Sequence, residues 1–209
     1  MQTRLEEIFN AVSHFLGTAL GITALILLVI KSSHLQSITM LISSIIYSLS
    51  LIIMFTASGI YHIVPYPKIK QKLKVLDHSS IYILIAGSYT PFCLISIPGI
   101  FGWILFGIIW SCAIAGVIFK LFFTHQFPKL SLALYLIMGW MAIIAIKPLL
   151  STLSLHGFFW LLGGGLCYSF GVLFYVLDHR FHLAHFIWHL FVLAGSFLHF
   201  FAIYFYVIR

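Results

Sequence analysis

The sequence predicts an all-α membrane protein built as a seven-transmembrane-helix bundle. Of its 209 residues, 62% are hydrophobic and 7% are charged, and the mean hydropathy is +1.13. Because so few polar side chains cannot cover a soluble globule, lipid has to cover most of the surface. The apolar runs are about 20 residues long, as in membrane-spanning helices, whereas strands of a transmembrane barrel form alternating segments of about 10 residues.

Seven apolar runs mark the spans. The first is longer than the apolar core of a signal peptide, about 7–15 residues, and no small-residue cleavage site follows, so it is expected to stay as a helix. A lysine-rich loop is expected at residues 66–76. The spans are predicted at residues 11–30, 38–63, 77–97, 100–119, 130–146, 157–177 and 184–208. Because the loops between them are short, one domain is expected over residues 1–209.

Proline and glycine residues predict where several spans end or bend. Pro98-Gly99 ends the third span, and Lys147-Pro148 ends the fifth. Pro91 should kink the third helix, because its nitrogen cannot donate to the carbonyl of Gly87. The polar run Ser88-Tyr89-Thr90 beside this kink indicates either the wall of a cavity or close packing of small residues between helices.

The positions of lysine and arginine predict the orientation. With the N-terminus in the cytoplasm, the inner side carries Arg4, Lys68, Lys70, Lys72, Lys74, Lys120, Lys129 and Arg180, and the outer side carries Lys31, Lys147 and Arg209. The positive-inside rule therefore favours a cytoplasmic N-terminus and an outside C-terminus, in the cell (inner) membrane. The lysine cluster is interpreted as a topology signal next to anionic headgroups, and no nucleic-acid-binding motif is visible.

Two histidines, His185 and His189, stand four residues apart at the start of the seventh span. Such residues share a helix face with Cβ atoms about 5–6 Å apart, which allows two imidazoles to bind one metal ion. The predicted topology brings Ser58, His62 and Asp77 to the same end of the membrane. Ser58 and His62 are also four residues apart, and Asp77 begins the third span. These five residues are therefore expected at one depth.

The chemistry of these residues favours Zn²⁺. His62, His185 and His189 would leave the fourth tetrahedral position open, as in catalytic zinc sites. Zinc lowers the pKa of water to about 7, and Asp77 would orient that water or accept its proton. Ser58, one turn deeper than His62, would hydrogen-bond the water, an imidazole or a carbonyl. The simpler interpretations are an N-cap for Asp77 and a bond to a helix carbonyl for Ser58.

Two further histidines lie near the same span. His182 shares a face with His185 and His189 if the seventh helix begins early, which makes it an alternative metal ligand. His199 lies about 15 Å beyond His189 along a helix, too far to share the ion. It is interpreted as an interior polar contact or as part of a substrate path.

A polar stripe enters the first span at Glu7, Asn10 and His14. One interpretation is an interfacial helix turn with a favourable acidic start. The other is a lid or buttress for the predicted metal site. The cysteines add no thiolate site, because their number is odd and no CxxC pair occurs; they are Cys93, Cys112 and Cys167.

Four segments resemble the successive motifs of the hemolysin III family, the bacterial branch of the progestin and adipoQ receptor (PAQR) superfamily. They are EEIFNAVSH, SGIYH, LDHSSIYILIAGSYTPF and HFIWHLFVLAGSFLHF, and they occur in the order of the family. The resemblance covers nearly the whole chain. It implies a seven-helix bundle with a cytoplasmic N-terminus, related to adiponectin receptors and alkaline ceramidases.

The same resemblance implies roles for individual residues. Zinc would be bound by His62, His185 and His189, which match the three histidines of the family. Asp77 would hold the reacting water, and Ser58 matches the serine of the family. The resemblance thus selects His185 and His189, rather than His182, as metal ligands.

Three functions are compatible with these features. The first is a zinc-dependent hydrolase that cleaves an amide or ester of a ceramide-like lipid, with Asp77 as general base and then proton donor. Membrane lipids would be both its environment and its substrate. The second is a non-enzymatic sensor or regulator of membrane lipid state with structural zinc. The third is a cytolytic pore, which the family name suggests; secreted pore formers are soluble before insertion, and this chain is expected to have no soluble domain.

Overall fold

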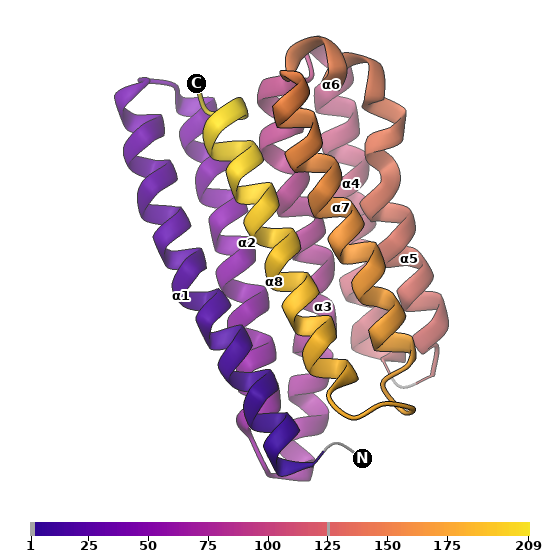
Figure 1. The fold of residues 1–209 in the computed structure, drawn as a ribbon. Coiled ribbons are helices and arrows are strands. Elements are labelled where there is room, and N and C mark those ends of the chain that lie inside the picture. Colours follow the sequence, from indigo (N-terminus) through magenta and orange to yellow (C-terminus); the bar gives the residue numbers. More distant parts are fainter. Residues whose placement is uncertain (1–2, 125) are drawn as a thin grey trace.

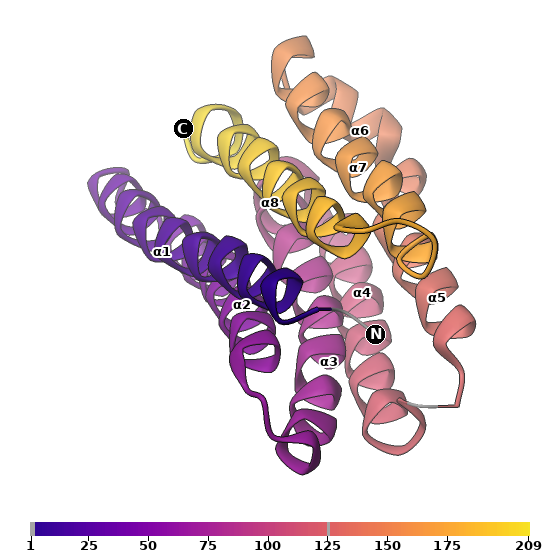
Figure 2. The same cartoon turned by 60° about the horizontal axis from the view of Figure 1, so that its bottom comes forward.

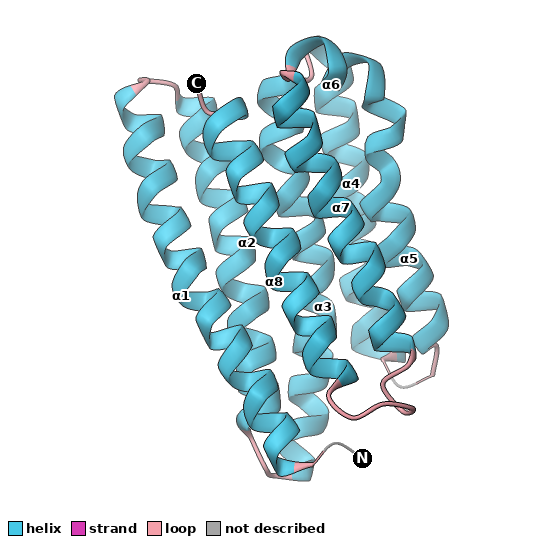
Figure 3. Ribbon diagram, in the orientation of Figure 1, coloured by secondary structure: helices cyan, strands magenta, loops and turns pink. Residues whose placement is uncertain are grey.

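The computed structural model describes residues 3–124 and 126–209, which form a bundle of seven long helical spans (Figure 1). Figure 3 shows helices joined by loops, and the described residues contain no strand. Each span is long and apolar enough to cross a membrane. The predicted all-α, seven-span membrane class is therefore confirmed.

The first two spans, α1 (Arg4–His34) and α2 (Ile38–Ile63), are joined by a short turn. α1 begins earlier than the predicted residue 11 because Thr3 and Glu6 form a capping box. Glu6 N donates to Thr3 Oγ1 at 3.2 Å, and Thr3 N donates to Glu6 Oε2 at 2.6 Å. These bonds satisfy the free N–H groups of the polar first turn. α2 has its predicted bounds and starts after Ser37, whose hydroxyl caps it.

The third span begins much earlier than predicted. α3 (Pro67–Pro91) includes the lysine-rich segment, so the loop predicted at residues 66–76 is wrong, and only residues 64–66 separate α2 from α3. Pro67 occupies the first helical position, where a missing N–H is harmless, and lysine is a good helix former. Hydropathy therefore located the point where α3 becomes apolar, which lies well after the start of the helix.

Pro91 is followed directly by a π-helical turn, η1 (Phe92–Ser96). The kink predicted at Pro91 thus takes the form of a wider helical turn, because the Pro91 nitrogen cannot donate a hydrogen bond to the preceding turn of the helix. The chain then turns at Gly99, whose φ of +69° is readily adopted only by glycine. This residue begins α4 (Gly99–Phe123), which extends past the predicted residue 119.

The fifth span consists of three consecutive segments. They are α5 (Pro128–Trp140), the 3₁₀ turn η2 (Met141–Ala145) and α6 (Ile146–Thr152). The prediction that this span ends at Lys147-Pro148 is wrong. Because the helix type changes just before this point, Pro148 falls in the first turn of α6, where its nitrogen has no helical carbonyl to reach.

The last two spans lie close to their predicted bounds. α7 runs over Leu155–Val176, and α8 (Ala184–Ala202) continues into the π-helical turn η3 (Ile203–Val207). The loop of residues 177–183 joins α7 to α8 and ends at Leu183, which has a left-handed φ of 63°. α8 therefore begins after His182, which lies in this loop.

The helices pack so that one end of the bundle gathers several distant segments. α1 packs against α2 and α8, and α7 packs against α8. α3 is the most buried span, with 67% of its apolar window inside the bundle. The two termini lie at opposite ends (Figure 1). Figure 2 brings forward the end that holds the N-terminus and the α2–α3, α4–α5 and α7–α8 loops, called here the N-terminal end.

Gly116 allows α4 to lie against α3, and this contact yields a stability prediction. A Cβ at Gly116 would lie 2.5 Å from the Tyr82 ring, whereas a Cβ at Gly107 of the same helix would have no atom within 4 Å. We expect Gly116→Val to lower the free energy of unfolding by about 1–3 kcal/mol through overpacking. Gly107→Val is the matched control and should melt close to the unchanged protein. Equal melting temperatures for the two purified variants would contradict this packing.

Candidate metal centre

Three histidines from two helices meet at the N-terminal end of the bundle. His62 lies at the end of α2, and His185 and His189 lie at the start of α8. One ligand nitrogen of each lies within 4.8 Å of the other two, and the ring centroids are 4.7–5.2 Å apart. His62 and His189 are buried, and His185 is half-buried. Nitrogen donors at this spacing can hold one metal ion.

Each histidine is oriented through its Nδ1 by an oxygen outside the cluster. His62 Nδ1 lies 2.7 Å from Glu7 Oε2, and His185 Nδ1 lies 3.2 Å from Asp178 Oδ2. His189 Nδ1 lies 3.3 Å from the backbone oxygen of Asn10. An oxygen acceptor favours an N–H at Nδ1, which leaves the lone pair of Nε2 free. Metal-binding histidines are commonly held by oxygens in this way.

One of the remaining nitrogens has the environment expected of a metal donor. Nε2 of His62 is buried and has no hydrogen-bond partner among residues 3–124 and 126–209. A buried polar atom left without a partner is costly, and coordination to a cation would satisfy it. Imidazole nitrogens suit zinc, copper, iron and nickel, whereas magnesium and calcium prefer oxygen. The donor set therefore fits a divalent transition metal.

The start of α1 supports the cluster from one side. The Glu7 carboxylate also accepts a hydrogen bond from Lys70 Nζ at 2.6 Å, so it connects α1 with α2 and α3. The His14 ring stacks on His189, with centroids 3.7 Å apart and planes at 18°. These contacts favour the buttress interpretation of the N-terminal polar stripe over that of an interfacial helix turn.

Asp77 and Ser58 lie on the wall of a cavity that also includes His185 and His189. Asp77 is 9% exposed, and the Ser58 side chain is its hydrogen-bonding neighbour. His62 and His185 are close enough to Asp77 to act on its charge. The alternative role of Asp77 as an N-cap is wrong, because α3 already begins at Pro67.

The two competing histidines lie away from the cluster. The His182 side chain is 92% exposed, and its Nδ1 lies 3.7 Å from Glu6 Oε1. His199 lies further along α8, where its Nε2 is 3.1 Å from the backbone oxygen of Leu161. Its imidazole packs against Gly164, where a Cβ would clash with the ring. His199 thus makes an interior polar contact and also lines the cavity, so both of its interpretations stay open. The position of His182 does not favour a ligand role.

Asp178 was not predicted as a site residue, although it orients His185. The chain has four acidic residues, and all four lie at the N-terminal end. Glu7 and Asp178 contact imidazoles, Asp77 lines the cavity, and Glu6 accepts from Leu183 N at 2.9 Å. In a chain so poor in carboxylates, their restriction to one membrane end is the signal that identifies Asp178.

A cavity of about 150 Å³ extends from His185 and His189 into the bundle. Its wall includes Asp77 and His185 near the N-terminal end and His199 deeper in the bundle. A second, mostly apolar chamber is also lined by Ser88 and His199, so the two spaces adjoin.

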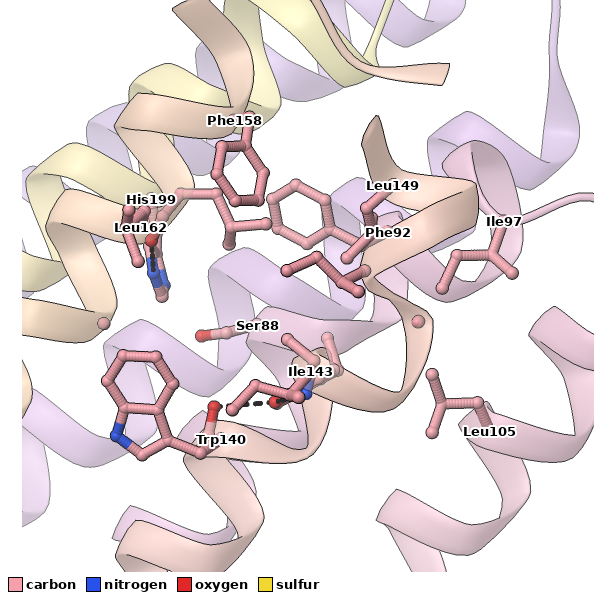
Figure 4. A pocket seen from close by; sticks show the side chains of 17 residues that line it. Ser88, Phe92, Ile97, Leu105, Trp140, Ile143, Leu149, Phe158, Leu162 and His199 are labelled. Atoms are coloured by element: carbon pink, nitrogen blue, oxygen red, sulfur yellow. Dashed lines mark hydrogen bonds between the residues drawn. The ribbon is translucent and has the colours of Figure 1, made fainter. Parts of the chain in front are cut away.

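Figure 4 shows this second chamber, with Ser88 and His199 among apolar side chains such as Phe158. Tyr89 lines both spaces, and its hydroxyl donates to the backbone oxygen of Gly139 at 2.7 Å. Two residues of the polar run Ser88-Tyr89-Thr90 therefore line a cavity. A cavity wall was one of the two interpretations of this run, the other being close packing between helices. The resulting path is polar at the histidines and apolar beyond His199.

Comparisons with known proteins agree over most of the chain. A family model described as "Haemolysin-III related" matches residues 2–200. The Hemolysin-3 protein of Bacillus cereus is 46% identical over 203 residues, which cover 97% of this chain and 92% of that protein. The Hemolysin-3 homolog of Bacillus subtilis (strain 168) is 43% identical over 210 residues, covering 100% and 98%. The human Monocyte to macrophage differentiation factor is 31% identical over 173 residues, covering 80% and 71%.

The contacts around the histidines predict graded metal affinities. Asp178→Asn keeps His185 but removes the carboxylate that orients it, so metal affinity should fall about 10- to 100-fold. His185→Ala removes a donor and should abolish stoichiometric binding. His182→Ala changes an exposed histidine of the adjoining loop and should leave binding unchanged. Competition with a chelator measures affinity and elemental analysis measures content; equal metal content in His185→Ala and the unchanged protein would contradict the site.

Proposed function

Because this chain belongs to the haemolysin-III-related family of multi-pass membrane proteins, within the PAQR superfamily, we propose that its histidine cluster binds zinc and that it hydrolyses an amide or ester bond of a membrane lipid. The observation that carries this proposal is a cluster of three histidines, two of which, His185 and His189, line one cavity together with the buried Asp77 carboxylate. With the N-terminus in the cytoplasm, as the positive-inside rule predicts, the site lies near the cytoplasmic face.

The zinc ligands are His62, His185 and His189, each through Nε2, because each Nδ1 already contacts an oxygen. When bound, zinc would supply a Lewis acid that polarises a carbonyl and acidifies water. Three protein donors, with no fourth from the cluster, match catalytic rather than structural zinc sites. Glu7 and Asp178 hold two of the rings in the orientation that this coordination needs.

Asp77 is the proposed general base. Its carboxylate lies on the cavity wall within electrostatic reach of His62 and His185. It would accept a proton from the attacking water and return it to the leaving nitrogen or oxygen. Ser58, 2% exposed, would act as a positioning residue by hydrogen-bonding to this carboxylate. An acidic residue in a membrane-spanning helix is costly to maintain, which supports a functional role.

The cavity supports a lipid as the substrate. The scissile carbonyl would lie between Asp77 and the imidazoles, at the polar end. An acyl chain would extend past His199 toward Phe158, along the mostly apolar second chamber (Figure 4). Burial of this chain would supply affinity roughly in proportion to the apolar area removed from water.

The role of Asp77 is tested by fatty acid release from amide- and ester-linked lipids by the purified, zinc-loaded protein. Asp77→Asn should lower turnover about 10²- to 10⁴-fold, the usual contribution of a general base. It should retain stoichiometric zinc and the melting temperature of the unchanged protein. His182→Ala serves as the control and should keep full turnover. Zinc-loaded, folded protein that is inert across the lipid panel would argue against the hydrolase.

A structural zinc in a non-enzymatic regulator of membrane lipid state is the second candidate. The cluster joins α2 to α8 and, through Glu7 and Asp178, also holds α1 and the α7–α8 loop. A metal bound to the histidine cluster would hold α1, α2, α8 and the α7–α8 loop together. This candidate predicts that chelation unfolds the protein and that activity in His62→Ala falls in proportion to stability, whereas the hydrolase predicts lost turnover in a stable Asp77→Asn protein.

A further inference from the structure

A buried lysine, Lys120, lines the same cavity but lies on α4, whereas the histidine cluster lies on α2 and α8. Lys120 lies near the end of α4, at the N-terminal end of the bundle, and is 1% exposed. Lysine is rarely buried unless it is paired with an acidic group. Among the described residues, no carboxylate forms an ion pair with Lys120. Its ammonium group therefore has no carboxylate partner at ion-pair distance within the described part of the chain.

The contacts of Lys120 orient its ammonium group without neutralising it. Lys120 Nζ lies 3.4 Å from His78 Nδ1 and 5.8 Å from the centre of the Tyr135 ring. The Tyr135 hydroxyl donates to the backbone oxygen of His78 at 2.7 Å, which fixes the ring beside the lysine. An ammonium group has three N–H donors. These contacts leave donors available toward the cavity, whose wall includes Lys120, His78 and Tyr135.

A second positive charge lies close by. Lys74, one turn before His78 on α3, is near enough to Lys120 to act on its charge. Asp77 is also within electrostatic reach, but its hydrogen-bonding neighbour is Ser58, on the side of the histidines. Two repelling lysines in a partly buried corner favour an anion between or beside them.

The position of this corner matches the depth of a lipid headgroup. Pro128, at the exposed start of α5, also lines the cavity, so the cavity reaches the surface close to Lys120. The ends of α4 and α5 that form this opening belong to the N-terminal end of the bundle (Figure 2). Lysines near the ends of membrane-spanning helices lie at the level of headgroups.

We infer that Lys120, with His78 and Tyr135, forms a binding subsite for a phosphate group in the cavity wall. Lysine binds phosphate as a point charge with several donors, and a phosphate monoester carries up to two negative charges to meet the two lysines. The phosphate belongs either to the headgroup of an anionic membrane amphiphile or to free inorganic phosphate. This inference concerns binding alone and stands independently of the proposed hydrolysis.

Calorimetric titration of the full chain in dodecyl maltoside tests the subsite, with dodecyl phosphate, dodecanoate and inorganic phosphate as probes. Dodecyl phosphate should bind to the unchanged protein, and Lys120→Met should weaken this binding about 10- to 100-fold, as expected when one charge-assisted hydrogen bond is lost. Lys120→Arg should retain it. Lys129→Met removes one exposed lysine at the same end and should bind as tightly as the unchanged protein.

The arms of this titration separate the sources of the phosphate. Binding of inorganic phosphate that is as tight as that of dodecyl phosphate, and that depends on Lys120, assigns the subsite to the free anion. Tighter binding of dodecyl phosphate assigns it to an amphiphile. Equal binding to the unchanged protein and Lys120→Met, or a Lys120-dependent preference for dodecanoate, would overturn the inference.

Two further variants keep the result independent of folding and of the metal. Lys120→Gln retains a hydrogen-bond donor and much of the side-chain length, so it provides a second charge-removing variant if the methionine variant cannot be purified. His189→Ala removes a proposed metal ligand and should bind dodecyl phosphate within about threefold of the unchanged protein. An absence of lipid turnover by the zinc-loaded unchanged protein, with Lys120-dependent phosphate binding intact, would thus contradict only the proposed hydrolase.

Discussion

Three imidazoles, two buried and one half-buried, meet inside an apolar bundle and need partners for their nitrogens, and the N-terminal end of this protein is arranged around that requirement. Their Nδ1 atoms meet two carboxylates and one backbone carbonyl. Those oxygens come from the polar, capped start of α1 and from Asp178 in the loop between α7 and α8. One ligand nitrogen of each histidine lies within 4.8 Å of the other two, and a divalent cation there would also satisfy the buried Nε2 of His62.

The sequence was sufficient to predict the class of fold and the residues that meet at the candidate site, because both depend on simple regularities. Long apolar runs fix the spans, and the order of spans fixes which end of the membrane each polar residue reaches. Starts of helices were less predictable, since α1 and α3 begin in polar sequence stabilised by a capping box and by Pro67. The shared membrane end of the four acidic residues points to Asp178, but its contact with His185 depends on how the α7–α8 loop folds, which the apolar pattern does not predict.

The cavity has two polar features at one end, and they differ in chemistry. His185, His189 and Asp77 contribute to one part of the wall, suited to a metal and to proton transfer, whereas Lys120 and His78 contribute to another, suited to an anion. Beyond them the lining becomes mostly apolar toward Phe158. A ligand that satisfies the whole cavity would therefore combine an anionic group, a polar linkage and a hydrocarbon chain, which is the composition of a membrane lipid.

Zinc K-edge absorption spectroscopy of the purified protein tests the central claim most directly, because it reports the atoms bound to the metal. The account predicts one zinc per chain, a first shell of nitrogen and oxygen at about 2.0–2.1 Å, and the multiple-scattering pattern of about three imidazoles. A first shell containing sulfur at about 2.3 Å, or a folded protein that takes up no zinc, would contradict it.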